Sequence, residues 1–196
     1  MSETYTVGIV GLGAIGLQLA RALDAGVPGL TLAAVAVRDR DKAVAAMKGF
    51  RDRPLVLDIA KLPRECDIIV EAAPAAAFAE IATTAVEAGC IFVPSSCGQL
   101  LAHMALVERA KETGARIIVP TGALLGLDAV RAAAEGEVFS ATIRSAKPPR
   151  GLEGAPYLVA NNLDMAKVTE RTRIFAGTIA VEGVEQSVSG RGNGLI

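Results

Sequence analysis

The sequence predicts an α/β fold, in which a doubly wound parallel sheet is followed by a small, incomplete α+β domain. Strand-like runs alternate with helical patterns over the first two-thirds of the 196 residues, which implies right-handed crossovers between parallel strands. Residues 30–37 are almost wholly apolar, which is typical of a strand covered on both faces. The alternation stops after Pro120, so we expect two domains, 1–120 and 121–196.

Each expected element follows from its own pattern of apolar residues. Runs of branched apolar residues predict strands, and apolar residues that recur every three or four positions predict helices. The expected strands of the first domain are 5–10, 30–37, 67–70, 91–93 and 116–119. The expected helices are 14–25, 41–48, 75–88 and 100–113. In the second domain we expect a helix at 124–134, a strand at 138–144, a loop at 147–156 and a poorly structured end.

Composition and charge exclude several classes of protein. The net charge of −1 gives no electrostatic footprint for nucleic acid or for an anionic membrane. The three cysteines, Cys66, Cys90 and Cys97, have no metal-ligand spacing, so we expect no metal site and a reduced, cytoplasmic setting. We also find no secretory signal at the start, and no uncharged apolar stretch of the ~18 residues that a transmembrane helix needs.

A glycine-rich turn, Gly11-Leu12-Gly13-Ala14-Ile15-Gly16, follows the first expected strand and opens the first helix. In this context Gly11 permits a tight turn, Gly13 lets a diphosphate approach the backbone, and Gly16 lets the helix lie close to the strand. The free N–H groups at Ala14 and Ile15 would then face the negative charge of the diphosphate. The turn predicts a Rossmann-type domain that holds NAD or NADP; the alternative is a turn that binds nothing.

The end of the second expected strand bears on which coenzyme is used. An acidic residue about 20 positions beyond the glycines normally takes the ribose hydroxyls. Here Val37 is followed by Arg38, Asp39 and Arg40. Arg38 takes the place of the acid and could pair with a 2′-phosphate, which predicts NADP use or dual use, while Asp39 could still reach the ribose. The alternative is a solvated charged turn.

Four later motifs carry a family resemblance. They are Glu71-Ala72-Ala73-Pro74, Ser95-Ser96-Cys97-Gly98-Gln99-Leu100, Pro120-Thr121-Gly122-Ala123-Leu124-Leu125-Gly126-Leu127-Asp128 and Arg144-Ser145-Ala146-Lys147-Pro148-Pro149. Taken in order, they resemble the L-aspartate dehydrogenase family over about residues 5–178. Members of that family use NAD(P) to oxidise the amine of aspartate to iminoaspartate, which yields oxaloacetate and ammonia or feeds NAD biosynthesis.

The resemblance implies roles for individual residues. Ala72 and Pro74 would lie along the coenzyme, and Ser96 and Cys97 near its nicotinamide side. Gly122 and Ala123 would bring backbone close to the nicotinamide, although a simple helix-opening turn also explains this pair. The remaining candidates are basic and would receive the two carboxylates of aspartate or a related dicarboxylate, unless they only form a solvated loop: Arg144, Lys147 and Arg150.

The resemblance ends at about residue 178. The family's asparagine-valine-alanine run and its catalytic histidine have no match in residues 179–196, so we expect a truncated member with reduced or no turnover. His103 is the only histidine, and its position within an expected helix predicts a partly exposed residue without a catalytic role. We therefore assign no catalytic residue.

Two other functions stay open, together with the state of assembly. Cys97 could act as the nucleophile of an aldehyde or semialdehyde dehydrogenase, because its turn resembles the cysteine turn of those enzymes. The chain could also be an NAD(P)-binding module without chemistry. A second domain as small as 121–196 would leave apolar surface exposed, which predicts a homodimer.

Overall fold

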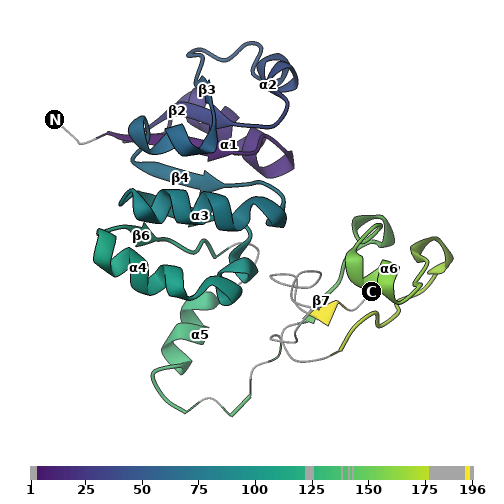
Figure 1. Cartoon of the computed structure of the whole chain (residues 1–196). Coiled ribbons are helices and arrows are strands. Elements are labelled where there is room, and N and C mark those ends of the chain that lie inside the picture. Colours follow the sequence, from purple (N-terminus) through teal and green to yellow (C-terminus); the bar gives the residue numbers. More distant parts are fainter. Residues whose placement is uncertain are drawn as a thin grey trace. The chain divides into compact units, whose positions relative to one another are not determined.

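The computed structural model of the chain describes residues 4–121, 126–137, 139, 140, 142, 144–176, 193 and 194 (Figure 1). The chain separates into two compact units, Met1–Pro120 and Thr121–Ile196, and each is described by itself. Within the described residues, no helix is long and apolar enough to cross a bilayer.

The first unit is a parallel sheet with helices on both faces, as predicted, and it has six strands where five were expected. The strand order is β3-β2-β1-β4-β5-β6, so the order reverses between β1 and β4. The strands are β1 (Tyr5–Val10), β2 (Leu30–Ala36), β3 (Leu55–Leu57), β4 (Ile68–Glu71), β5 (Ile91–Pro94) and β6 (Arg116–Ile117). The helices are α1 (Ala14–Gly26), α2 (Arg40–Ala46), α3 (Phe78–Glu87) and α4 (Ala105–Thr113). Three 3₁₀ segments, Ile59–Arg64, Ala75–Ala77 and Cys97–His103, complete the connections.

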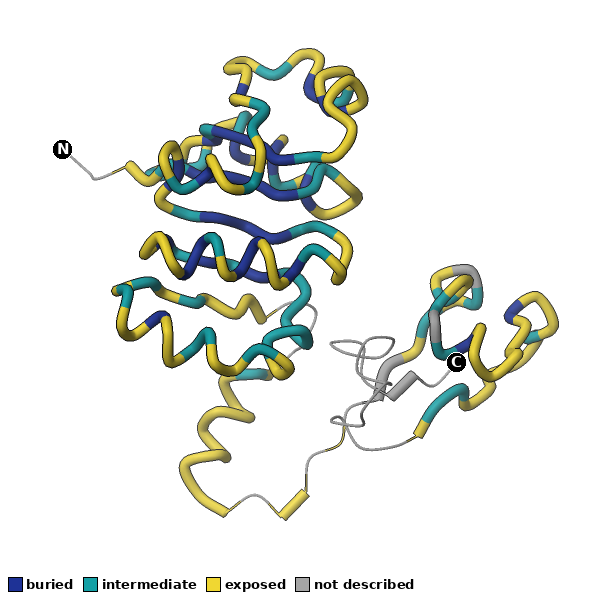
Figure 2. Tube along the Cα trace, in the orientation of Figure 1, coloured by how far each residue is buried: buried dark blue, intermediate teal, exposed yellow. Residues whose placement is uncertain are grey.

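Alternate residues of the central strands face two separate cores, because side chains alternate across a sheet. Ile69 packs in the cluster that α3 covers, where Phe78 and Phe92 meet edge to face with ring centroids 5.8 Å apart. Val70 packs in the other cluster, together with Leu23 of α1. Figure 2 shows the central strands as the most deeply buried part of the first unit. Helices on both faces explain the continuous apolar runs of the strands.

The structure differs from the sequence-based expectation in three connections. The edge strand β3 was not predicted, because three partly exposed residues give no clear periodicity. β6 ends at Ile117 instead of residue 119. The expected helix 100–113 is divided into the 3₁₀ segment Cys97–His103 and α4. In that segment the ring Nδ1 of His103 lies 2.8 Å from the carbonyl oxygen of Gln99, an oxygen that an α-helix would offer to a backbone N–H.

The second unit contains short elements. α5 (Leu127–Ala133) agrees with the centre of the helix expected at 124–134. β7 (Arg144–Ser145) pairs in parallel with β8 (Asn193–Gly194). The expected loop 147–156 contains the 3₁₀ turn Pro149–Gly151 and leads into α6 (Pro156–Ala160), which is followed by a 3₁₀ turn at Met165–Lys167. The strand expected at 138–144 is largely wrong, because residues 139, 140 and 142 form no strand and only Arg144 belongs to one, β7. Residues 138, 141 and 143, and nearly all of 179–196, lie outside the described residues.

Candidate functional site

Gly11 directly follows β1 and adopts a conformation that favours glycine. Its φ is +92°, in the left-handed region, and its N–H donates to the carbonyl oxygen of Ala36 at 2.8 Å. A Cβ atom added at Gly11 would stand 2.5 Å from the carbonyl oxygen of Ala72. The turn therefore depends on glycine here for conformation and for close packing against the loop after β4.

Gly16 and Gly13 occupy opposite environments within the same turn. Gly16 is buried, and an added Cβ would overlap the carbonyl oxygen of Gly11. At Gly13, no atom of the described residues beyond the two chain neighbours lies within 4 Å of an added Cβ, and φ is an ordinary −77°. Close packing thus explains why residue 16 is glycine, whereas neither packing nor backbone conformation requires glycine at position 13. The free space beside Gly13 is what close approach of a ligand requires.

The first turn of α1 faces that same space. Gly13 caps the helix without a side-chain hydrogen bond, and no acidic residue lies in the first turn. Ala14 and Ile15 are exposed, Ile15 to 63%. Uncapped N–H groups and the positive end of the helix dipole form a binding site for an anion. This site lies at the carboxyl end of β1, beside the reversal of strand order where such sheets bind ligands.

The three charged residues after β2 have different surroundings. Asp39 caps α2, because its carboxylate accepts the N–H of Lys42 at 2.9 Å. Arg40 pairs with Asp58 at 2.7 Å. Arg38 is exposed, and within the described part of the chain its guanidinium has neither a hydrogen-bond nor an ion-pair partner. The structure thus gives Asp39 a capping role, and it leaves Arg38 available.

Glu71 is the last residue of β4 and a functional candidate. It belongs to the motif Glu71-Ala72-Ala73-Pro74, but the sequence alone gave it no role. Its carboxylate is completely buried, with an exposed fraction of 0%. It accepts the N–H of Ala73 at 3.0 Å and the N–H of Ser96 at 2.8 Å. Ser96 Oγ donates a third hydrogen bond at 3.2 Å. Two of the predicted coenzyme contacts, Ala72 and Ser96, therefore lie on loops that one carboxylate joins.

Cys97 is a packed thiol rather than an activated nucleophile. Its Sγ donates to the carbonyl oxygen of Pro94 at 3.3 Å. Burial raises the pKa of the Cys97 thiol, and the negative charge of Glu71 raises it further. A raised pKa keeps the thiol protonated at neutral pH, whereas catalytic cysteines need a lowered one. His103 is turned toward Gln99, and its ring centroid lies 5.4 Å from that of Phe78. Both observations disfavour the aldehyde dehydrogenase alternative.

The other predicted site residues are distributed differently. Pro74 is exposed after β4, in the turn that leads to Ala75–Ala77. Gly122 and Ala123 lie outside the described residues. The basic candidates belong to the second unit, where Arg144 is in β7, Lys147 is half-buried in the next loop, and Arg150 is in the 3₁₀ turn Pro149–Gly151.

A glycine turn at the reversal point of a parallel sheet with this strand order defines a dinucleotide-binding protein of the Rossmann class. Residues 11–120 match the family described as homoserine dehydrogenase, NAD binding domain. Residues 128–184 match the family described as aspartate dehydrogenase, C-terminal. The chain belongs to the L-aspartate dehydrogenase family, which confirms the resemblance predicted from its motifs.

Individual relatives agree with this assignment. The chain is 48% identical to an L-aspartate dehydrogenase of Bradyrhizobium diazoefficiens, over 90% of this chain and 63% of that protein. It is 39% identical to an L-aspartate dehydrogenase of Methanocella arvoryzae, over 90% of this chain and 67% of the relative. The crystal structure of aspartate dehydrogenase from Thermotoga maritima shares the fold, with a TM-score of 0.64 at 22% identity over 97% of this chain and 71% of that one. The chain thus spans about two thirds of the length of these relatives.

Proposed function

We propose that this chain acts in the NAD(P)-dependent oxidation of L-aspartate. The reaction would transfer a hydride from the Cα of aspartate to the nicotinamide ring and release a proton, and the iminoaspartate product would hydrolyse to oxaloacetate and ammonia. Membership of the family and the match of residues 128–184 support this substrate. The observation that carries the proposal is the free space at Gly13 beside the uncapped start of α1, since close approach of a diphosphate requires such space.

The proposed coenzyme contacts follow the carboxyl edge of the sheet. Backbone N–H groups of the turn from Gly11 to Gly16 would hold the diphosphate, and Arg38 would select a 2′-phosphate. The loops after β4 and β5 would border the nicotinamide half, through Ala72, Pro74, Ser96 and Cys97. Gly122 and Ala123 remain proposed contacts of the nicotinamide. Arg144, Lys147 and Arg150 remain proposed contacts of the substrate carboxylates.

Two glycine variants test the coenzyme site. Gly13→Ala should lower stability by only about 1 kcal/mol or less, as expected for alanine at an N-cap, but raise the Kd of NADPH roughly tenfold or more, because a methyl group would fill the space for the diphosphate. Gly16→Ala should lower stability by roughly 2–4 kcal/mol as well, because its Cβ overlaps the Gly11 carbonyl. Calorimetric titration and urea denaturation measure the two effects.

Gly136→Ala is the matched control, because the nearest atom to its added Cβ is 3.8 Å away. It should change neither the affinity nor the stability. Wild-type protein that binds neither coenzyme, or a Gly13→Ala variant that binds as wild type does, would contradict the proposed site.

A turnover assay separates the dehydrogenase from a module that only binds. The protein is mixed with NADPH, oxaloacetate and ammonia, and the absorbance of the reduced coenzyme is followed. Loss of absorbance supports the dehydrogenase, whereas binding without turnover supports the module.

A homodimer remains a proposal that size-exclusion chromatography tests. Exposed apolar side chains of the second unit favour it, among them Val130 and Phe139, the latter 88% exposed.

A further inference from the structure

Glu71 is a buried charged residue that the binding scheme above leaves unexplained. It stands out because, among the described residues, no other charged side chain is buried. Removing a carboxylate from water is costly unless hydrogen bonds or a cation compensate. Within the described part of the chain, no lysine or arginine pairs with Glu71, so its three hydrogen bonds carry that compensation.

Those hydrogen bonds join two loops. Ala73 follows β4 and donates its N–H to Oε1, while Ser96 follows β5 and donates its N–H to Oε2 and its hydroxyl to Oε1. The backbone adds to this, since the N–H of Ser95 donates to the Glu71 carbonyl oxygen at 2.9 Å. One residue therefore fixes the start of both loops relative to the sheet.

The position of Glu71 connects it with the proposed coenzyme. Glu71 pairs with Val10 across the β1–β4 ladder, so it lies beside the glycine turn at the reversal of strand order. Sheets of this order bind one mononucleotide over each half. Arg38 follows β2 in the half proposed to hold the 2′-phosphate end. The nicotinamide end then lies over the other half, where the loops joined by Glu71 begin.

We propose that Glu71 is a positioning residue of the coenzyme site, which fixes the loops after β4 and β5 and favours the oxidised coenzyme through its charge. The inference rests on the proposed function, because it presumes that a nicotinamide coenzyme binds. The nicotinamide ring is positively charged when oxidised and neutral when reduced. A negative charge near the ring would attract the first form more than the second, and the low dielectric of the interior would strengthen that attraction.

Glu71→Gln tests the proposal, because glutamine keeps the shape of the side chain but removes the charge and turns one acceptor into a donor. Calorimetric titration with NADP⁺ and with NADPH gives both affinities. We expect both Kd values to rise, and that of NADP⁺ to rise by a further factor of roughly three to ten. An unchanged ratio of the two Kd values, with a lower melting temperature alone, would reduce Glu71 to a structural residue and overturn the proposal.

Two further variants separate charge from position. Ser96→Ala removes one hydrogen bond but keeps the Glu71 charge, so both Kd values should rise by the same factor. This variant also tests the positioning role if Glu71→Gln does not fold, and unchanged affinities would then contradict it. Asp67→Asn removes a carboxylate at the other end of β4, and it should leave the ratio unchanged. If the wild-type protein binds neither NADP⁺ nor NADPH, the proposed function itself is wrong. If the wild type binds both but the ratio of the two Kd values is unchanged in Glu71→Gln, only the role of Glu71 is wrong.

Discussion

The amino and carboxyl ends of the parallel strands use similar charged residues for different purposes. At the amino end of β4, Asp67 accepts the N–H and the hydroxyl of Thr6 at 2.8 and 2.7 Å, and it remains exposed. At the carboxyl end, Glu71 accepts the same kinds of donor but is completely buried. Asp67 ties the starts of two neighbouring strands together. Glu71 joins the two loops that follow β4 and β5.

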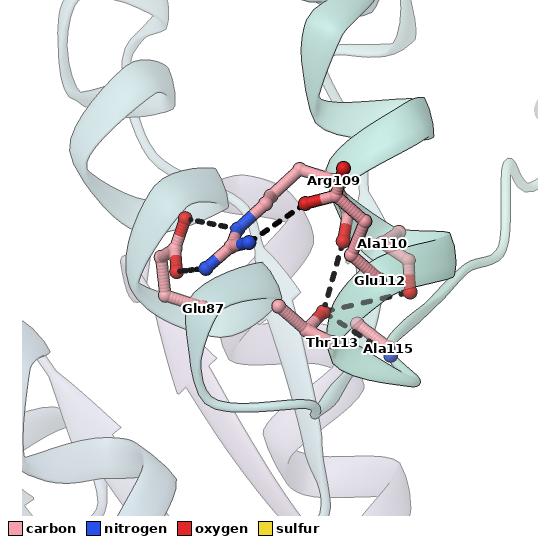
Figure 3. Close-up of polar contacts among 6 residues, drawn as sticks. All are labelled: Glu87, Arg109, Ala110, Glu112, Thr113 and Ala115. Carbon is pink, nitrogen blue, oxygen red and sulfur yellow. Dashed lines mark hydrogen bonds and ion pairs between the residues drawn. The ribbon is translucent and has the colours of Figure 1, made fainter.

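The same contrast holds for two arginines. Arg109 of α4 donates to both carboxylate oxygens of Glu87, at 2.8 and 2.6 Å, and to Glu112 at 2.7 Å (Figure 3). Arg38, beyond the carboxyl end of β2, has no such partner within the described residues. A charged group whose partners are all within the protein stabilises the fold. One that is left without a partner beside an anion site is available for a ligand.

The largest expected effect concerns Arg38. Arg38→Ala should raise the Kd of NADPH roughly tenfold and leave that of NADH nearly unchanged, because only NADPH carries the 2′-phosphate. Calorimetric titration of both coenzymes measures the change in preference. Arg40→Ala is the matched control, since it removes a neighbouring charge that is already paired with Asp58. If the wild-type protein binds NADH as tightly as NADPH, the proposed role of Arg38 in binding the 2′-phosphate is wrong.

An intermediate effect is expected at Asp67. The hydrogen bonds from Thr6 hold the pKa of this carboxyl below its usual range. Its contribution to stability is therefore present above the unfolded value of about 3.9, and it is lost as the pH falls through the lower folded value. Asp67→Asn should lower the melting temperature by a few degrees near pH 7, and the difference from wild type should shrink below about pH 4. A constant difference across this range would show that the charge is irrelevant.

The smallest effect is expected at Arg109. Glu87 and Glu112 raise the pKa of the Arg109 guanidinium, so it stays charged at every accessible pH. Arg109 and Glu87 are about half exposed and Glu112 about two thirds, and solvent weakens such pairs. Arg109→Ala should therefore lower the melting temperature by only about 2 °C, and 1 M salt should remove most of the difference. A loss of coenzyme affinity in this variant would contradict the distinction between charged groups that stabilise the fold and charged groups that are available to a ligand.

Much of the fold could be predicted because its signals are local. The apolar run of 30–37 and the glycine turn each predicted an element and its place in a parallel sheet, and both are confirmed. The strand β3 was missed because it is only three residues long and depends on its pairing with β2. The division of 97–113 was missed because a change from 3₁₀ to α-helix leaves no mark in the spacing of apolar residues.

The site was less predictable because it depends on contacts between distant segments. Glu71 and Ser96 are 25 positions apart, and only the pairing of β4 with β5 brings them together. A charged residue that ends an apolar strand is the one signal that could have indicated a buried carboxylate. For Asp39, the sequence suggested a ribose contact or a solvated charged turn, and the cap of α2 became visible only in the structure.

The packing of His103 has a practical consequence for spectroscopy. Its imidazole belongs to the segment that begins directly after Ser96, and the ring lies against Phe78 of the buried core. Because the chain has a single histidine, its ring protons give one isolated set of NMR resonances, sensitive to the ring current of the neighbouring phenyl group. Movement of the loop after β5 would shift those resonances, so the protein carries a built-in reporter of that loop without any label.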